Sequence, residues 1–180
     1  LAEAPDVVVV ATGARFEPVT VPGVPAERVA RARDLFEKPE GAGPRVVIVG
    51  AGVAGLALAD LMAEHGRRVT VVDADPEIEP PYGRAVSRAL LDRLARAGAR
   101  LVAGARAERA EGGRLRIARN GDVETLEFDT LVVARERRAN PSLAEALRSR
   151  GLAVRSVGDC VEPRSLFDAV NEAAETARSI

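Results

Sequence analysis

The segment Val46–Gly55 reads VVIVGAGVAG and decides the fold. Its first half is a run of apolar, mostly β-branched residues, which predicts a buried strand. The second half is G-x-G-x-x-G: Gly50 permits a tight turn, Gly52 lets a ligand approach the backbone, and Gly55 lets the next helix pack closely. Residues 53–64 follow with helical spacing of apolar side chains. A strand, a glycine turn and a helix in this order predict a β-α-β unit whose turn binds the pyrophosphate of a dinucleotide.

An acidic residue ends the next predicted strand, which covers residues 69–72. Asp73 lies 18 residues after Gly55, where a carboxylate can accept hydrogen bonds from both adenosine-ribose hydroxyls and repels a 2′-phosphate. No Arg follows the strand until Arg84, so a clamp for a 2′-phosphate is missing. We therefore expect NAD(H) in preference to NADP(H). The predicted contacts in this unit are Gly50, Ala51, Gly52, Val53, Ala54, Gly55 and Asp73.

Strands and helices alternate along the rest of the chain, which implies parallel β-α-β connections. Further apolar strands are predicted over 6–11, 130–134 and 152–157, and further helices over 83–97, 141–150 and 165–179. Ser165 and Asp168 have the spacing of a capping box at the start of the last helix. The stretch 15–44 is rich in Pro and Gly and predicts a connector with one helical turn near 30–36.

A different pattern separates the third predicted helix from the strand at 130–134. Residues 100–110, 114–119 and 123–128 alternate apolar and polar side chains. The pairs Gly112-Gly113 and Asn120-Gly121 between them are good hairpin turns. We predict three antiparallel strands here, and an α/β fold overall.

Composition excludes several function classes. The 180 residues carry 26 basic and 27 acidic side chains, a net charge of -1, so no strong field attracts nucleic acid or an anionic membrane. One Cys and one His rule out an internal disulfide, a Cys-based zinc site and a multi-His metal site. The sequence contains no run of 18 apolar residues, so we predict no membrane span. We expect no metal, no nucleic acid and no membrane partner. Because the chain starts at Leu1 with a strand soon after, we also expect a domain cut from a longer protein.

Two flanking motifs add a resemblance. Val9–Gly13 reads VVATG and Val157–Cys160 reads VGDC. With the β-α-β unit and the meander, they resemble the Rossmann-like, three-layer FAD/NAD(P)-binding fold of two-dinucleotide flavoproteins. The tail, GDCVEPR over Gly158–Arg164 followed by DAV over Asp168–Val170, is similar to the C-terminal region of one family. That family contains 2,4-dienoyl-CoA reductase, trimethylamine dehydrogenase and related NADH:flavin oxidoreductases with an old-yellow-enzyme-like barrel.

The resemblance implies a domain plan and a set of partners. Residues 44–137 would be the NAD(P)-binding domain, and 1–43 with 138–180 a flanking FAD-binding domain whose N-terminal half is missing. An upstream barrel of the same polypeptide would carry FMN and an iron–sulfur cluster, in a cytoplasmic enzyme, and a homo-oligomer is left open. FAD would bind only to the full-length protein, and poorly or not at all to this chain. The resemblance also implies cofactor contacts from Thr12, Gly13, Ala134, Gly158 and Asp159.

The chain departs from the family pattern after the strand at 130–134. The family shows Ala-x-Gly-Arg-x-Pro-Asn, and Ala134–Asn140 reads ARERRAN, with Glu136 in place of the glycine and Ala139 in place of the proline. A bulky anion there could hinder NADH. An alternative function is therefore a nucleotide-free or ADP-binding structural or interaction module of an amine-dehydrogenase-like flavoprotein. No side chain is a convincing acid, base or nucleophile, and Cys160 without a partner thiol is typical of packing, so we expect no catalytic residue in this chain.

Overall fold

The chain forms two compact units. The computed structural model describes residues 5–16, 21–25, 28–78, 80, 83–134 and 137–180. The larger unit is Pro18–Arg135, and the smaller unit combines Leu1–Glu17 with Glu136–Ile180. The sequence-based domain boundaries, which begin the nucleotide-binding domain at residue 44, remain a prediction.

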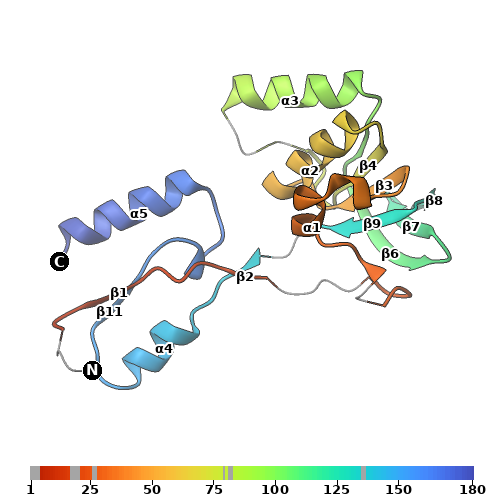
Figure 1. Cartoon of the computed structure of the whole chain (residues 1–180). Helices are drawn as coiled ribbons and strands as arrows, with labels where there is room; N and C mark the ends of the chain where they lie inside the picture. Colours follow the sequence, from red (N-terminus) through yellow and green to blue (C-terminus); the bar gives the residue numbers. More distant parts are fainter. Residues whose placement is uncertain (1–4, 17–20, 26–27, 79, 81–82, 135–136) are drawn as a thin grey trace. The chain divides into compact units, whose positions relative to one another are not determined.

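The larger unit contains the predicted β-α-β core and the meander (Figure 1). Its strands and helices are, in order, α1 (Ala32–Glu37), the short 3-10 helix η2 (Pro39–Gly41), β3 (Arg45–Val49), α2 (Val53–Glu64), β4 (Arg68–Val72), α3 (Arg84–Arg96), β5 (Arg100–Val102), β6 (Ala105–Glu111), β7 (Arg114–Arg119), β8 (Asp122–Glu127) and β9 (Thr130–Val133).

A four-stranded parallel sheet in the order β5-β4-β3-β9 forms the middle layer. Side chains alternate between its two faces, as the pleat of a strand requires. Val46 and Ile48 pack in one apolar cluster with α1, α2 and α3, whereas Val47 packs in a second cluster with the antiparallel strands. The helices therefore cover one face of the sheet and the meander covers the other (Figure 1). This confirms the three-layer α/β fold.

The antiparallel sheet β6-β7-β8 confirms the meander, and its turns lie where the sequence predicts them. Gly112, Gly113, Asn120 and Gly121 all have positive φ angles, as tight hairpins require.

The prediction of one antiparallel strand over 100–110 is wrong. Residues 100–102 form β5, which pairs parallel with β4, and the meander begins only at β6. The division occurs at Gly104, which has φ +67° and donates its N–H to the carbonyl of Asp75 at 2.7 Å. A left-handed glycine redirects the chain from the parallel sheet to the meander.

The helical turn predicted near 30–36 is present as α1, and the connector also contains a bridge to β9 that was not predicted. Helix α1 buries Ala32 and Leu35 against the core of the larger unit. Ala30 forms a parallel bridge with Val132, its N–H donating to the carbonyl of Leu131 at 2.8 Å. Two apolar side chains at helical spacing thus anchor one short helix in a segment rich in proline and glycine.

The smaller unit has a parallel pair, β1 (Val8–Val10) with β11 (Val154–Ser156), and an antiparallel pair, β2 (Arg15–Phe16) with β10 (Arg137–Arg138). Its helical elements are α4 (Ser142–Arg148), the 3-10 helix η3 (Gly158–Cys160) and α5 (Leu166–Arg178). Ser165 and Asp168 form the predicted capping box of α5. The described core of this unit is small: its buried apolar side chains are Val10, Ala144, Val157 and Cys160. Helix α5 buries none.

Candidate functional site: a glycine turn at the end of a parallel sheet

The glycine turn lies where β3 ends, beside the end of β4. Gly50 has φ +111°, a conformation that favours glycine, and donates its N–H to the carbonyl of Val72 at 2.8 Å. Ala51 is buried, and Gly52 is the N-cap residue of α2. The turn therefore lies at the carboxyl ends of two neighbouring parallel strands, which is where open α/β sheets bind ligands.

Gly52 and Gly55 lack side chains for two different reasons. A Cβ built on Gly52 would meet no atom within 4 Å, so space is open beside the backbone there. A Cβ built on Gly55 would collide with the carbonyl oxygen of Gly50 and lie 3.2 Å from the Cβ of Ala134. Gly55 is needed for packing within the fold, and Gly52 leaves room for a ligand.

The N-terminus of α2, which is the positive end of the helix dipole, lies beside this space. No side chain caps this helix, and its first turn, Val53 included, carries no acidic residue. The first N–H groups of a helix have no partner within it and form the positive end of its dipole. An anionic group such as a pyrophosphate fits the open side at Gly52. The residues present thus fit the dinucleotide that the sequence predicts.

Asp73 lies under the turn and is 5% exposed. Its Oδ2 accepts the N–H of Ala51 at 2.5 Å, and its Oδ1 accepts the N–H of Asp75 at 3.0 Å. The sequence predicts Asp73 as a ribose contact. The residue pattern does not predict the hydrogen bond to Ala51, because the β-α-β unit brings the ends of β3 and β4 together without showing which backbone N–H the carboxylate accepts.

The predicted site residues fall into two sets. Gly50–Gly55, Asp73 and Ala134 belong to the larger unit, where Ala134 donates its N–H to the carbonyl of Val49 at 2.8 Å, beside the turn. Thr12, Gly13, Gly158 and Asp159 belong to the smaller unit. Gly13 and Gly158 both have left-handed backbone, with φ +72° and +70°. Glu136, which departs from the family pattern, lies outside the described residues.

Asp159 is engaged within the smaller unit. Its Oδ2 accepts the Arg137 guanidinium at 2.6 Å and its Oδ1 accepts the N–H of Arg164 at 3.1 Å. Gly158 donates its N–H to Glu172 at 2.7 Å, and Glu172 also pairs with Arg164. The 180 residues contain one G-x-G-x-x-G, and it lies in the larger unit. The described part of the smaller unit therefore offers a carboxylate and two glycines, but no phosphate-binding turn for a flavin dinucleotide.

Cys160 is a packing residue in this structure. Its thiol is buried and donates to the carbonyls of Val10 and Val157 at 3.3 and 3.2 Å. The sequence-based interpretation of packing agrees with these contacts.

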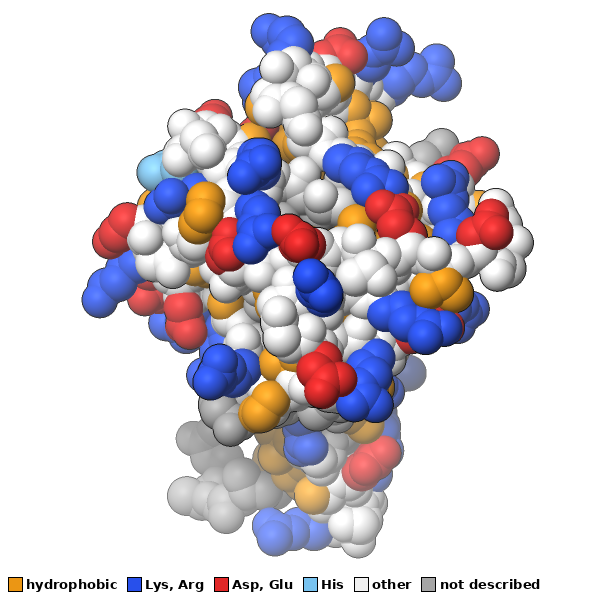
Figure 2. Space-filling view, turned by 90° about the vertical axis from the view of Figure 1, so that its right-hand side faces the viewer, with side chains coloured by type: hydrophobic (Ala, Val, Ile, Leu, Met, Phe, Trp, Pro, Cys, Tyr) orange, Lys and Arg blue, Asp and Glu red, His pale blue; other side chains and the backbone are white. Residues whose placement is uncertain are grey.

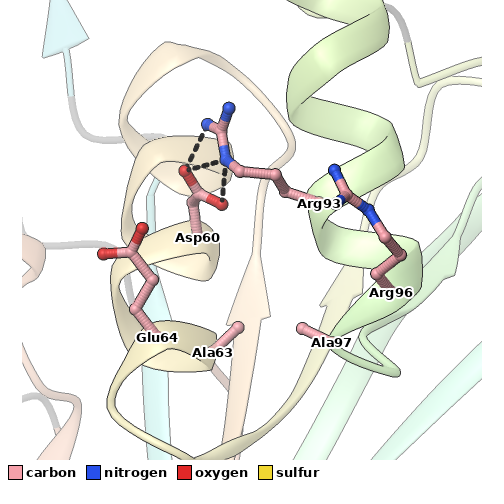
Figure 3. Close-up of a pocket in the computed structure, with 6 residues that line it drawn as sticks. All are labelled: Asp60, Ala63, Glu64, Arg93, Arg96 and Ala97. Atoms are coloured by element: carbon pink, nitrogen blue, oxygen red, sulfur yellow. Dashed lines mark hydrogen bonds and ion pairs between the residues drawn. The ribbon is translucent and has the colours of Figure 1, made fainter.

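A hollow of about 290 Å³ lies between the C-terminal halves of α2 and α3. In Figure 3, Asp60 and Arg93 point toward each other across it, and Glu64 points away. The Asp60–Arg93 ion pair, 2.5 Å long, raises the pKa of the arginine through its hydrogen bond. The hollow is at the opposite end of α2 from the glycine turn. Its lining consists of this ion pair, which joins two packed helices, with Ala63, Glu64, Arg96 and Ala97.

Charges of both signs mix on the surface shown in Figure 2. Arg116 and Glu108 form an ion pair within the meander, and Arg100 of β5 forms one with Glu124 of β8. Among the residues with described coordinates, no group of three or more His, Cys, Asp or Glu side chains could hold a metal ion. The described helices include none with the length and apolarity to cross a bilayer.

Comparison with known proteins adds the family. A model described as pyridine nucleotide-disulphide oxidoreductase matches residues 3–165. This chain belongs to the pyridine nucleotide-disulphide oxidoreductase family. The description names a pyridine nucleotide as ligand and oxidoreduction as chemistry, in agreement with the glycine turn and the open start of α2.

Two individual relatives and one solved structure are similar over most of the chain. Bilirubin reductase of Mediterraneibacter gnavus is 30% identical over 162 residues, covering 90% of this chain and 25% of that protein. Dihydrolipoyl dehydrogenase 3 of Pseudomonas aeruginosa is 32% identical over 172 residues, covering 89% and 34%. A 2-naphthoyl-CoA reductase structure superposes with a TM-score of 0.78 at 27% identity, covering 99% of this chain and 27% of that one. The chain spans about a quarter to a third of these relatives.

Proposed function

We propose that this chain binds NAD(H) at the glycine turn and presents it for hydride transfer to a flavin held by a longer flavoprotein oxidoreductase. The observation that carries the proposal is the contrast between Gly55, which the fold requires, and Gly52, beside which space is open at an uncapped helix start. The chain's own residues bind and orient the dinucleotide, and the redox chemistry belongs to the cofactors.

The preference for NAD(H) rests on charge at the end of β4. Asp73, Asp75 and Glu77 follow this strand within five positions. A 2′-phosphate on the adenosine ribose would meet these carboxylates, and the segment 73–83 holds no arginine to offset them. NADPH should therefore bind more weakly than NADH.

Isothermal titration with NADH, NADPH and ADP tests the proposal. We expect NADH and ADP to bind one per chain with dissociation constants below about 1 mM, and NADPH to bind roughly tenfold more weakly. Binding weaker than millimolar for all three would overturn the proposal and favour the nucleotide-free module. A preference for NADPH would overturn the assignment of Asp73 and its neighbours.

We further propose that the smaller unit is part of a flavin domain completed by another segment of the same polypeptide. Parallel sheets normally belong to larger folds in which helices cover both faces. The described parallel sheet of the smaller unit has two strands, β1 and β11. Helix α5 leaves Leu166 82% and Phe167 73% exposed. An upstream segment carrying a second glycine turn would supply strands for the sheet and cover for α5.

Spectroscopy of purified protein tests this second proposal. The 180-residue chain should purify without the visible absorption of a flavin, and a longer polypeptide that includes the upstream segment should purify yellow. Flavin bound to the 180-residue chain would overturn it. The similarity to 2-naphthoyl-CoA reductase supports a place near the dienoyl-CoA-reductase-like branch of these enzymes, and the substrate site would lie outside this chain.

A further inference from the structure

We propose that Asp73 is a positioning residue that holds the glycine turn in its phosphate-binding shape, a role separate from any contact with ribose. This inference rests on the proposed function, because it concerns the same turn. Its starting point is burial: among the residues that the structure describes, Asp73 is the one charged side chain that is buried. A buried carboxylate is costly unless hydrogen bonds compensate it.

One of the compensating hydrogen bonds comes from the glycine turn itself. Ala51, between the first two motif glycines, donates its N–H to Asp73 Oδ2 at 2.5 Å. Ala51 is 7% exposed, so water is a poor substitute acceptor. A hydrogen bond to an ionised acceptor is stronger than one between neutral groups. Gly50 and Gly52 have wide conformational freedom on either side, and this bond fixes the peptide between them.

The other end of the link is rigid. The backbone of Asp73 donates its N–H to the carbonyl of Val102 at 2.9 Å and accepts the N–H of Ala105 at 2.8 Å. Its Oδ1 also accepts the N–H of Asp75 at 3.0 Å. Asp73 is thus attached to the ends of β4 and β5 and to the start of β6. Through its carboxylate, the sheet sets the shape of the turn.

Two ligands separate positioning from ribose contact. ADP has both ribose hydroxyls, and 2′,3′-dideoxy-ADP has neither but keeps the pyrophosphate. If Asp73 positions the turn, Asp73→Ala weakens both ligands, by roughly tenfold for the dideoxy compound, since the N–H of Ala51 loses its acceptor. If Asp73 acts on ribose alone, the variant weakens ADP and leaves dideoxy-ADP unchanged, which overturns the inference. Glu64→Gln, which removes an exposed charge at the end of α2 far from the glycine turn, is the matched control and should change dideoxy-ADP binding little.

Amide hydrogen exchange gives a readout that needs no ligand. The Ala51 amide should exchange slowly in the native chain and roughly tenfold faster in Asp73→Ala, while Val47 in β3 stays protected. Asp73→Asn keeps the size of the side chain but has one acceptor oxygen, so in that variant the Ala51 or the Asp75 amide must exchange faster. Unchanged exchange at both positions would overturn the inference. Failure of the native chain to bind ADP or NADH would instead overturn the proposed function.

Discussion

Gly55 has no room for a side chain, because its missing Cβ would occupy the place of the Gly50 carbonyl oxygen. Gly55→Ala should therefore force the turn and α2 apart. Overpacking of this kind costs about 1–3 kcal/mol, and we expect the free energy of unfolding in urea to fall by that amount. An alanine variant as stable as the native chain would show that the close contact between turn and helix is not required.

Gly52 should behave in the opposite way, since a Cβ there meets nothing within 4 Å. Gly52→Val should cost at most about 1 kcal/mol of stability, because Val is a poorer N-cap than Gly, and should lower NADH affinity roughly tenfold or more, because its side chain fills the space beside the turn. Titration and urea unfolding of the same samples separate the two effects. Gly41→Val is the matched control: Gly41 is equally open and lies in η2. Equal NADH affinity in both variants would place the ligand elsewhere.

At the scale of elements, ion pairs join the parallel sheet to the meander and to the start of β9. Arg45 of β3 binds Asp129 at 2.8 Å, and Arg100 of β5 binds Glu124 of β8 at 2.5 Å. Hydrogen bonds from these arginines lower the pKa of Asp129 below its ordinary value of 3.8 and the pKa of Glu124 below 4.5. A carboxyl group whose pKa is lowered by folding stabilises the folded state at pH values above its ordinary pKa. This stabilisation is lost as the pH falls through the lower pKa of the folded state.

Stability should therefore fall on acidification below about pH 4.5. Asp129→Asn should be less stable than the native chain at neutral pH and lose less of its stability between about pH 5 and 3. Urea midpoints across this range measure the difference. Because both carboxylates are partly exposed, 1 M salt should reduce it. Parallel pH curves for the two proteins would contradict the assignment.

The capping box fixes the start of α5. Ser165 Oγ accepts the N–H of Asp168 at 3.2 Å, and the Asp168 carboxylate accepts the N–H of Ser165 at 3.1 Å. Since α5 buries no side chain, this cap should contribute much of its stability. Ser165→Ala should cost about 1 kcal/mol, seen as faster exchange of the amides in the first turns of α5. Ser149→Ala, at the end of α4, is the control and should leave α5 unchanged.

The sequence pattern predicted those strands and helices for which the spacing of apolar residues and the turn residues indicate the same structure. The strand over 45–49 and the helix over 53–64 match β3 and α2, because an apolar run, a glycine turn and helical spacing all point to one structure. The strand over 100–110 failed because Leu101 and Val102 fit either kind of strand, and Gly104, which redirects the chain, was the available signal. The bond from Asp73 to Ala51 could not be predicted, because the β-α-β pattern brings the two strand ends together but does not show which backbone N–H the carboxylate accepts.

At the scale of the whole molecule, the two units have very unequal cores. The larger unit has two apolar clusters, one on each face of its sheet, whereas the described core of the smaller unit consists of Val10, Ala144, Val157 and Cys160. Local stability follows the density of buried apolar contacts. Amide exchange should therefore be markedly faster in β1 and β11 than in β3 and β4. Equal protection would show that the smaller unit is a complete domain by itself.

An NMR titration of the 180-residue chain with NADH tests the central claim most directly, because it reports both binding and place. We predict saturable shifts centred on the amides of residues 50–55 and 73–75, with a dissociation constant below about 1 mM and weaker shifts with NADPH. Absence of saturable shifts at millimolar NADH, or shifts centred away from the glycine turn, would contradict the account.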